Sequence, residues 1–111
     1  MVCTQLVHLS VCWNRVGDQG LAHLSRGLQA TTNLQHLDLS KNNIGEDGAE
    51  QLALSLKFCP VLTSLNLSRN FLGNDGVAHV ANAVSEHSRN LKHLQLQMNY
   101  AGESGAVTLA E

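Results

Sequence analysis

The sequence predicts an α/β solenoid in which short parallel strands line a concave face and helices cover the convex face. A pattern of leucine, asparagine and glycine recurs four times along the 111 residues. Each copy joins a strand-like alternation to a helix-like apolar stripe. One strand and one helix cannot bury both apolar faces alone, so the units have to stack. The crossovers between parallel strands are then expected to be right-handed.

The repeats begin at leucines spaced 28, 28 and 29 residues apart: Leu6, Leu34, Leu62 and Leu91. An apolar residue follows three and five positions later, which places both side chains on one face of a strand. We expect residues 1–111 to form one array with a truncated last repeat. Neither end carries a polar capping unit, so we expect a segment of a longer array, with marginal stability or end-to-end association.

An asparagine stands eight residues after each leading leucine, where the chain leaves the strand. These residues are Asn14, Asn42, Asn70 and Asn99. Their amides can satisfy backbone groups of two turns, so we predict a buried ladder. Glycines recur three residues further on, at Gly17, Gly45, Gly73 and Gly102, and again three residues after that. We expect these pairs to allow backbone conformations closed to other residues and a close approach between coils.

A helix is predicted after each glycine pair. In the second repeat the apolar residues fall at i, i+3, i+4 and i+7: Ala49, Leu52, Ala53 and Leu56. That spacing forms one apolar helix face. Asp18 and Glu46 stand near the predicted helix starts, where the helix dipole favours acidic side chains.

The full pattern, L-x-x-L-x-L-x-x-N-x-φ-G-x-x-G with φ an apolar residue, resembles the ribonuclease-inhibitor type of leucine-rich repeat. It is similar to repeats of NOD-like receptors and of Ran GTPase-activating proteins, which share the asparagine and the glycine pair. Ribonuclease inhibitor often alternates cysteine with asparagine there, so four asparagines favour the other two families. The resemblance implies a horseshoe segment that binds a partner protein and is not an enzyme.

Composition narrows the class of partner and the compartment. The net charge is −2 without a run of Lys or Arg, which argues against nucleic acid or a membrane surface. No apolar stretch approaches the roughly 18 residues of a membrane span, and the first residues do not resemble a signal peptide. Three cysteines without paired spacing indicate free thiols in a reducing compartment, so we expect a cytoplasmic protein.

The resemblance places partner-binding residues on the concave face and its rim. On the strands these are His8, His36, Asp38, Asn66, His93 and Gln95. At the rim they are Trp13, Lys41, Arg69, Phe71, Met98 and Tyr100. Trp13 is the most suggestive of them because tryptophan is enriched at interface hot spots. The alternative for Trp13 is that it covers the core edge of the first repeat.

Two kinds of chemistry are weaker interpretations of the same residues. His8 and His36 are expected on neighbouring strands, but zinc needs three or four converging ligands and His93 lies too far away. Ser10, His36 and Asp38 form rows rather than a nucleophile with an oriented base. We therefore predict no metal, no cofactor and no catalysis. The preferred function is a scaffold such as a NOD-like-receptor sensor segment; the alternatives are a Ran-activator-like GTPase-activating segment and a cytoskeletal or ciliary scaffold.

Overall fold

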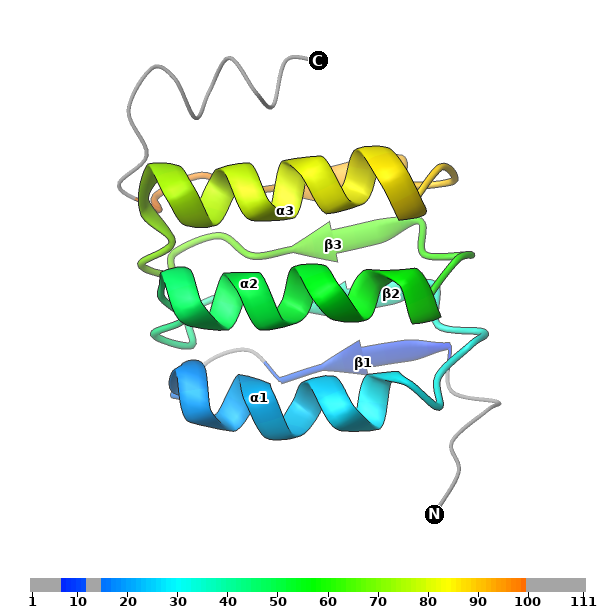
Figure 1. Ribbon diagram of the computed structural model, residues 1–111, viewed down its shortest axis with the longest axis horizontal. Coiled ribbons are helices and arrows are strands. Elements are labelled where there is room, and N and C mark those ends of the chain that lie inside the picture. The colour runs from blue at the N-terminus through cyan, green and yellow to red at the C-terminus, as the bar shows by residue number, and fades with distance from the viewer. Residues whose placement is uncertain (1–6, 12–14, 100–111) are drawn as a thin grey trace.

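A computed structural model describes residues 7–11 and 15–99 and shows an α/β solenoid (Figure 1). Each repeat forms one turn of the solenoid, which we call a coil, and the coils stack on one another. The elements in chain order are β1 (His8–Ser10), α1 (Gly17–Leu28), β2 (His36–Asp38), α2 (Glu46–Ser55), the 3-10 helix η1 (Leu56–Phe58), β3 (Ser64–Asn66), α3 (Gly73–His87) and β4 (His93–Gln95). Strand and helix alternate as the repeat pattern predicts, and the predicted fold class is confirmed. None of the described helices is long and apolar enough to cross a bilayer.

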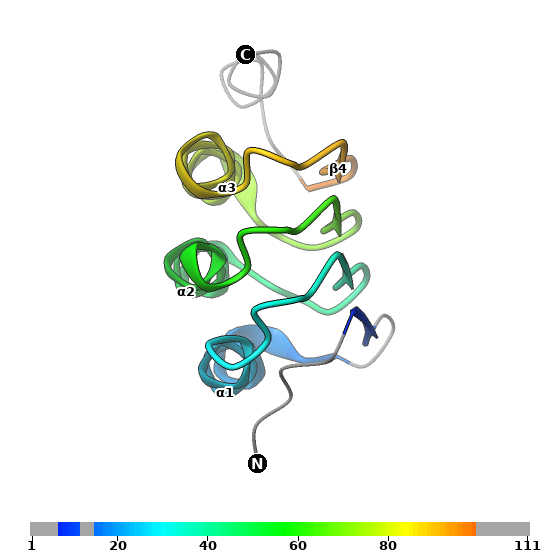
Figure 2. The same cartoon turned by 90° about the vertical axis from the view of Figure 1, so that its right-hand side faces the viewer.

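The four strands form one parallel sheet in sequence order, β1-β2-β3-β4. The central leucines of the strands are cross-strand partners, so Leu9, Leu37, Leu65 and Leu94 form one row. Viewed along the strands, the helices stand in one column and the strands in another (Figure 2). The sheet therefore has one face toward the helices and one face open.

The core lies between these two columns. Leu37 and Leu65 point into it from the strands and are at most 1% exposed. Leu52 and Val80 meet them from α2 and α3 and are fully buried. One detail of the predicted stripe is wrong, since α2 ends at Ser55 and Leu56 opens the 3-10 helix η1. Leu56 is nevertheless fully buried, because the tighter turn still directs its side chain inward.

The predicted asparagine ladder is confirmed for Asn42, Asn70 and Asn99, which are at most 2% exposed. Each side-chain amide donates to carbonyls of its own turn and of the preceding coil, as Asn70 Nδ2 does to Leu67 O and Leu39 O. Each side-chain oxygen accepts backbone N–H groups of the preceding coil. Asn14 lies outside the described residues.

The glycines follow the prediction in part. Gly17 and Gly73 have φ of +67°, which favours glycine. For Gly45 the predicted backbone is wrong, because its φ of −100° and ψ of −162° are extended backbone that any residue adopts. The predicted close approach holds there, since an added Cβ would lie 3.2 Å from Asp18 Oδ2 of the neighbouring coil. The approach is closer at Gly48, where an added Cβ would come within 2.8 Å of Ile44 Cγ2 and still closer to an oxygen of Asp18. Gly102 lies outside the described residues.

Asp18 lies in the first turn of α1, as predicted, and its carboxylate bonds to the neighbouring coil. Its Oδ1 accepts the backbone N–H groups of Gly45, at 2.7 Å, and Gly48, at 3.0 Å. Those groups belong to the first turn of α2, whose N-cap residue Gly45 has no capping side chain. The carboxylate therefore caps a helix 27 residues further along the chain.

Cys59 is a free thiol at the centre of the core and is fully buried. Its Sγ lies 3.6 Å from Thr31 Oγ1 and 3.8 Å from Leu28 O. Burial raises the pKa of the Cys59 thiol, and the hydrogen bond between Cys59 and Thr31 opposes this with a smaller effect. The reactive thiolate is therefore scarce at neutral pH. The other two cysteines, Cys3 and Cys12, lie outside the described residues.

We predict that Cys59 resists thiol reagents in the folded protein. In a variant with Cys3→Ser and Cys12→Ser, labelling near pH 8 is expected to be at least about 100-fold slower folded than denatured, because exposure and thiolate character govern reactivity. A raised folded pKa also means that this thiol's contribution to stability is kept at neutral pH and declines as pH rises through the folded pKa. Equal labelling rates in the two states would contradict the buried placement.

Candidate partner-binding surface

The open face of the sheet carries two rows of side chains that alternate with the buried leucines. One row consists of His8, His36, Ser64 and His93, and the other of Ser10, Asp38, Asn66 and Gln95. Their members are exposed or half-buried. All six strand residues predicted to bind a partner lie in these rows, so the structure brings them onto one surface.

Two members of the second row also shape the turns that follow their strands. Asp38 Oδ1 accepts from the backbone N–H and the hydroxyl of Ser40, at 3.0 and 2.8 Å. Asn66 Oδ1 does the same with Ser68, at 3.0 and 2.8 Å. The sequence indicates this turn, because an Asp or Asn stands two residues before a Ser, and side chains at that spacing bond to the backbone locally. Sequence reasoning missed that role.

The side chains considered for metal binding and for catalysis do not converge on one centre in the described residues. The rings of His8 and His36 lie 5.6 Å apart and are tilted, whereas Ser64 separates His36 from His93. Over residues 7–11 and 15–99, no group of three or more potential metal ligands converges. The bonds described for the Asp38 carboxylate go to Ser40, so this carboxylate does not orient His36 as a triad would require.

The turns at the carboxyl edge of the sheet have an unusual backbone. Lys41, Arg69 and Met98, one in each of three successive coils, have φ of 59°, 59° and 60°. Arg15 and Asn43, at another repeat position, have φ of 48° and 59°. Left-handed backbone is uncommon for residues other than glycine. Hydrogen bonds between coils stabilise it, since Lys41 N–H donates to Ser68 O and Arg69 N–H donates to Gln97 O, both at 3.0 Å.

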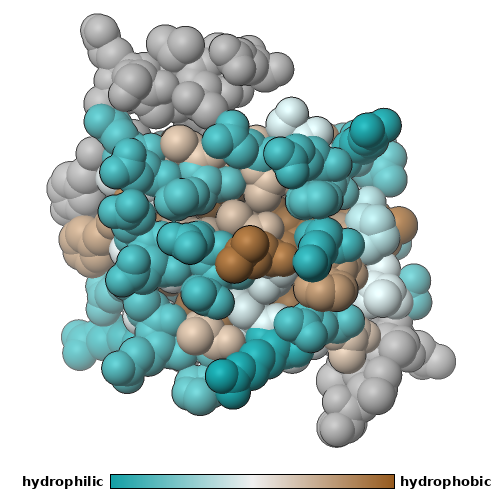
Figure 3. Space-filling view, in the orientation of Figure 1, coloured by the Kyte–Doolittle hydropathy of each residue, from teal (hydrophilic) through white to brown (hydrophobic). Residues whose placement is uncertain are grey.

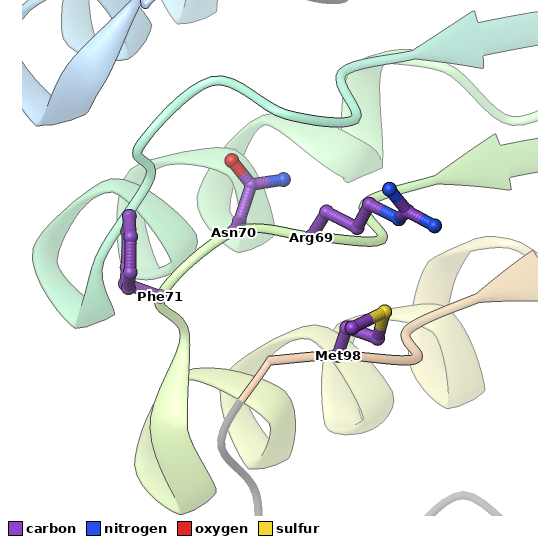
Figure 4. Close-up of a pocket in the computed structure, with 4 residues that line it drawn as sticks. All are labelled: Arg69, Asn70, Phe71 and Met98. Atoms are coloured by element: carbon purple, nitrogen blue, oxygen red, sulfur yellow. The ribbon is translucent and has the colours of Figure 1, made fainter.

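These turns line two hollows at the rim. The first, of about 250 Å³, is lined by Arg69, Asn70, Phe71 and Met98 (Figure 4). In the close-up, Arg69, Asn70 and Phe71 follow one another on one loop and Met98 lies on the next. The second, of about 220 Å³, is lined by Arg15, Lys41, Asn43, Arg69 and Phe71. The structure thus brings four of the six predicted rim residues together; Trp13 and Tyr100 lie outside the described residues.

The helical face offers a different surface. A hollow of about 390 Å³ lies between α1 and α2 and includes Arg26, Gln29, Gln51 and Leu54 in its lining. Figure 3 views this face, which is mostly hydrophilic with a small apolar cluster near its centre. Leu54 of α2 is 60% exposed. This face provides matched control positions for experiments on the sheet and its rim.

Comparison with known proteins agrees with this geometry. The family described as leucine-rich repeat matches residues 2–25, 31–53 and 58–81. Among solved structures, one of leiomodin-1 actin-binding site 2 is similar, with a TM-score of 0.81 and 20% sequence identity. The match covers 97% of this chain, which spans 64% of the length of that structure. At this identity the likeness shows the fold. No curated protein matches the sequence.

Proposed function

Because this chain belongs to the leucine-rich repeat family, we propose that it is a non-enzymatic scaffold that holds a partner protein against its concave sheet. The two side-chain rows on the open sheet face carry this proposal. Adjacent members of a row are about 4.8 Å apart, the spacing of neighbouring strands. A broad, open and polar face suits a protein surface, whereas small molecules favour enclosed, mostly apolar cavities.

Within the family we propose the ribonuclease-inhibitor type and a sensor segment like those of NOD-like receptors, acting in the cytoplasm. The support is the repeat length of 28 or 29 residues, the asparagine in every repeat and the glycine pair after it. The free thiol of Cys59 is consistent with a reducing compartment. Three of the four asparagines form the ladder described above.

A cytoskeletal scaffold is the second candidate, and the fold shared with leiomodin-1 actin-binding site 2 favours it. Pelleting this chain with purified actin filaments tests that candidate directly. A GTPase-activating segment is the remaining alternative from the repeat pattern. Because a scaffold has no catalytic role, we expect no acceleration of GTP hydrolysis by a panel of small GTPases.

We predict that one bulky change on the concave face removes partner binding. Ser64 lies in the middle of the first row, so Ser64→Arg projects a long side chain into any docked partner. Proteins captured from cytosol by the immobilised chain are expected to fall at least about 10-fold, a loss of about 1.4 kcal/mol. Quantitative mass spectrometry of the captured proteins measures this.

Gln51→Arg is the matched control, because it adds the same side chain to an exposed position on α2. Capture by this variant is expected to equal that of the original chain. Loss with Gln51→Arg and retention with Ser64→Arg would move the partner to the helical face and refute the concave assignment. Thermal unfolding of both variants confirms that each is folded.

A further inference from the structure

The two rim hollows adjoin each other, because Arg69 and Phe71 line both of them, and together they make up one region of the surface. We call this the rim groove, and its chemistry comes from Arg15, Lys41, Asn43, Arg69, Phe71 and Met98. It crosses the ends of successive strands at the carboxyl edge of the sheet. One end is apolar and the other is basic.

The apolar end exposes two large side chains to solvent. Phe71 is 53% exposed and Met98 is 66% exposed. Both line the same hollow. Figure 4 shows Met98 next to the Arg69 side chain and Phe71 further along the loop that carries Arg69. Exposed aromatic and methionine side chains that line one hollow are typical of protein contact surfaces, where both residue types are enriched. This end therefore has room and chemistry for one apolar side chain of a partner.

The basic end concentrates positive charge in a chain whose net charge is −2. Three of its seven Lys and Arg residues, Arg15, Lys41 and Arg69, line this one groove. Among the described residues, the ion pairs involve neither Arg15 nor Arg69. The groove is thus a local site for anions on a weakly acidic molecule.

The carboxylates closest to the groove along the chain are engaged elsewhere. Asp38 accepts both hydrogen bonds of Ser40, and Asp18 accepts the first backbone N–H groups of α2. Glu46 Oε1 lies 3.9 Å from His79 Nε2, in the layer of helices. None of these three acids forms a described ion pair with Arg15 or Arg69, to which a carboxylate of a partner can therefore pair.

Hydrogen bonds between coils fix the backbone of the rim groove in the unbound chain. Phe71 N–H donates to Ile44 O at 2.8 Å, and Arg69 N–H donates to Gln97 O at 3.0 Å. Asn70, between them, is 1% exposed and belongs to the asparagine ladder. Preorganisation of this kind lowers the entropic cost of binding.

We propose that the rim groove binds an acidic segment of a partner protein, in which an apolar side chain is followed by Asp or Glu residues. The apolar side chain packs on Phe71 and Met98, and the carboxylates pair with Arg69, Lys41 and Arg15. This inference rests on the proposed scaffold function and adds the chemistry of the partner. An extended segment advances about 3.3 Å per residue, so two or three acidic residues reach across neighbouring coils about 4.8 Å apart.

The test uses the full chain and a short fluorescent peptide with one Phe followed by Asp and Glu residues. Fluorescence anisotropy should show binding that weakens as salt is raised, because the contacts are charge pairs near the surface. A peptide with Lys in place of every acidic residue should not bind. Arg69→Glu and Phe71→Ala should each weaken binding of the acidic peptide at least about 10-fold, and Arg69→Gln should weaken it less than Arg69→Glu.

Two controls match these changes elsewhere on the molecule. Arg89→Glu makes the same charge change at an exposed position before β4, at the opposite edge of the sheet. Leu54→Ala removes an exposed apolar side chain from α2. Both variants should bind the acidic peptide as the original chain does, and thermal unfolding should show that all variants are folded.

The outcomes separate this proposal from the scaffold function. Failure of the acidic peptide to bind, or equal binding of the basic peptide, overturns the groove assignment, while loss of captured partners with Ser64→Arg still supports the scaffold. Tighter binding of phosphatidylserine vesicles or of single-stranded RNA than of the acidic peptide also overturns it. Capture that is insensitive to Ser64→Arg, together with no peptide binding, overturns both proposals.

Discussion

Asn70→Ala is expected to lower the free energy of unfolding by about 3 kcal/mol, enough to unfold much of a marginally stable array. The Asn70 side chain bonds to backbone groups of two coils. Its Nδ2 donates to Leu39 O at 3.0 Å and to Leu67 O at 2.9 Å. Its Oδ1 accepts from the backbone N–H groups of Asn42, at 2.9 Å, and Ile44, at 3.0 Å. Alanine leaves these buried groups without that partner, and each such group costs about 1–3 kcal/mol.

Urea unfolding followed by far-ultraviolet circular dichroism measures this loss. Asn82→Ala is the matched control, because Asn82 is exposed on α3 and alanine has the higher helix propensity. The control should keep or slightly raise the stability. A loss below about 1 kcal/mol for Asn70→Ala would show that water or neighbouring groups replace the ladder.

Asn70→Asp tests whether this site requires the amide donors or only a side chain of the same size. Aspartate has nearly the same volume and keeps one oxygen in the place of Oδ1, but its second oxygen replaces the Nδ2 donor and faces the carbonyls of Leu39 and Leu67. A buried charge that faces acceptors is strongly unfavourable. We therefore expect this variant to be at least as unstable as Asn70→Ala; near-normal stability would indicate that packing, not the amide donors, is what the site requires.

Gly48→Ala is expected to cost about 2 kcal/mol, because the coils have no room for a Cβ at this position. An added Cβ would collide with a carboxylate oxygen of Asp18 and come within 2.8 Å of Ile44 Cγ2 and 3.2 Å of Leu21 Cδ2. Relief of such a clash requires backbone or side-chain shifts that cost about 1–3 kcal/mol. The same denaturant titration measures the change.

Gly27→Ala is the same substitution as Gly48→Ala, but we expect it to raise the stability of the protein. Gly27 lies near the end of α1, is exposed, and has nothing within 4 Å of the position of an added Cβ. Alanine in a helix is favoured over glycine, so a gain of about 0.5 kcal/mol is expected. Destabilisation by both substitutions would show that helix formation, not the fit between coils, governs these positions.

A double variant tests the source of the Gly48→Ala effect. Asp18→Ala alone removes the bonds to Gly45 and Gly48 and should cost about 1 kcal/mol, as loss of a helix cap does. In Asp18→Ala with Gly48→Ala, the clashing carboxylate is already absent, so the combined loss should be smaller than the sum of the single losses. Strict additivity would exclude the contact between Asp18 and Gly48 as the cause.

The sequence by itself determined what lies within one repeat. Leu37 and Leu65 alternate with polar neighbours and point into the core, as the period of two requires. The asparagine ladder also followed from the sequence, because one residue type at one position in stacked repeats has to align. The strand residues of the predicted binding surface follow from the same alternation, so His36, Asp38 and Asn66 lie on the open face.

Only the tertiary structure decided what depends on contacts between coils. Asp18 lies in the first turn of its own helix as predicted, but the sequence did not show that it also caps α2, because only the stack places the start of the next helix beside it. Lys41 and Arg69 have left-handed backbone although neither is glycine, so the sequence does not indicate it. Hydrogen bonds to the neighbouring coil stabilise this conformation. The rim groove follows from these turns. Local patterns report the surroundings of a residue along the chain, whereas these features are set by partners 27 to 30 positions away.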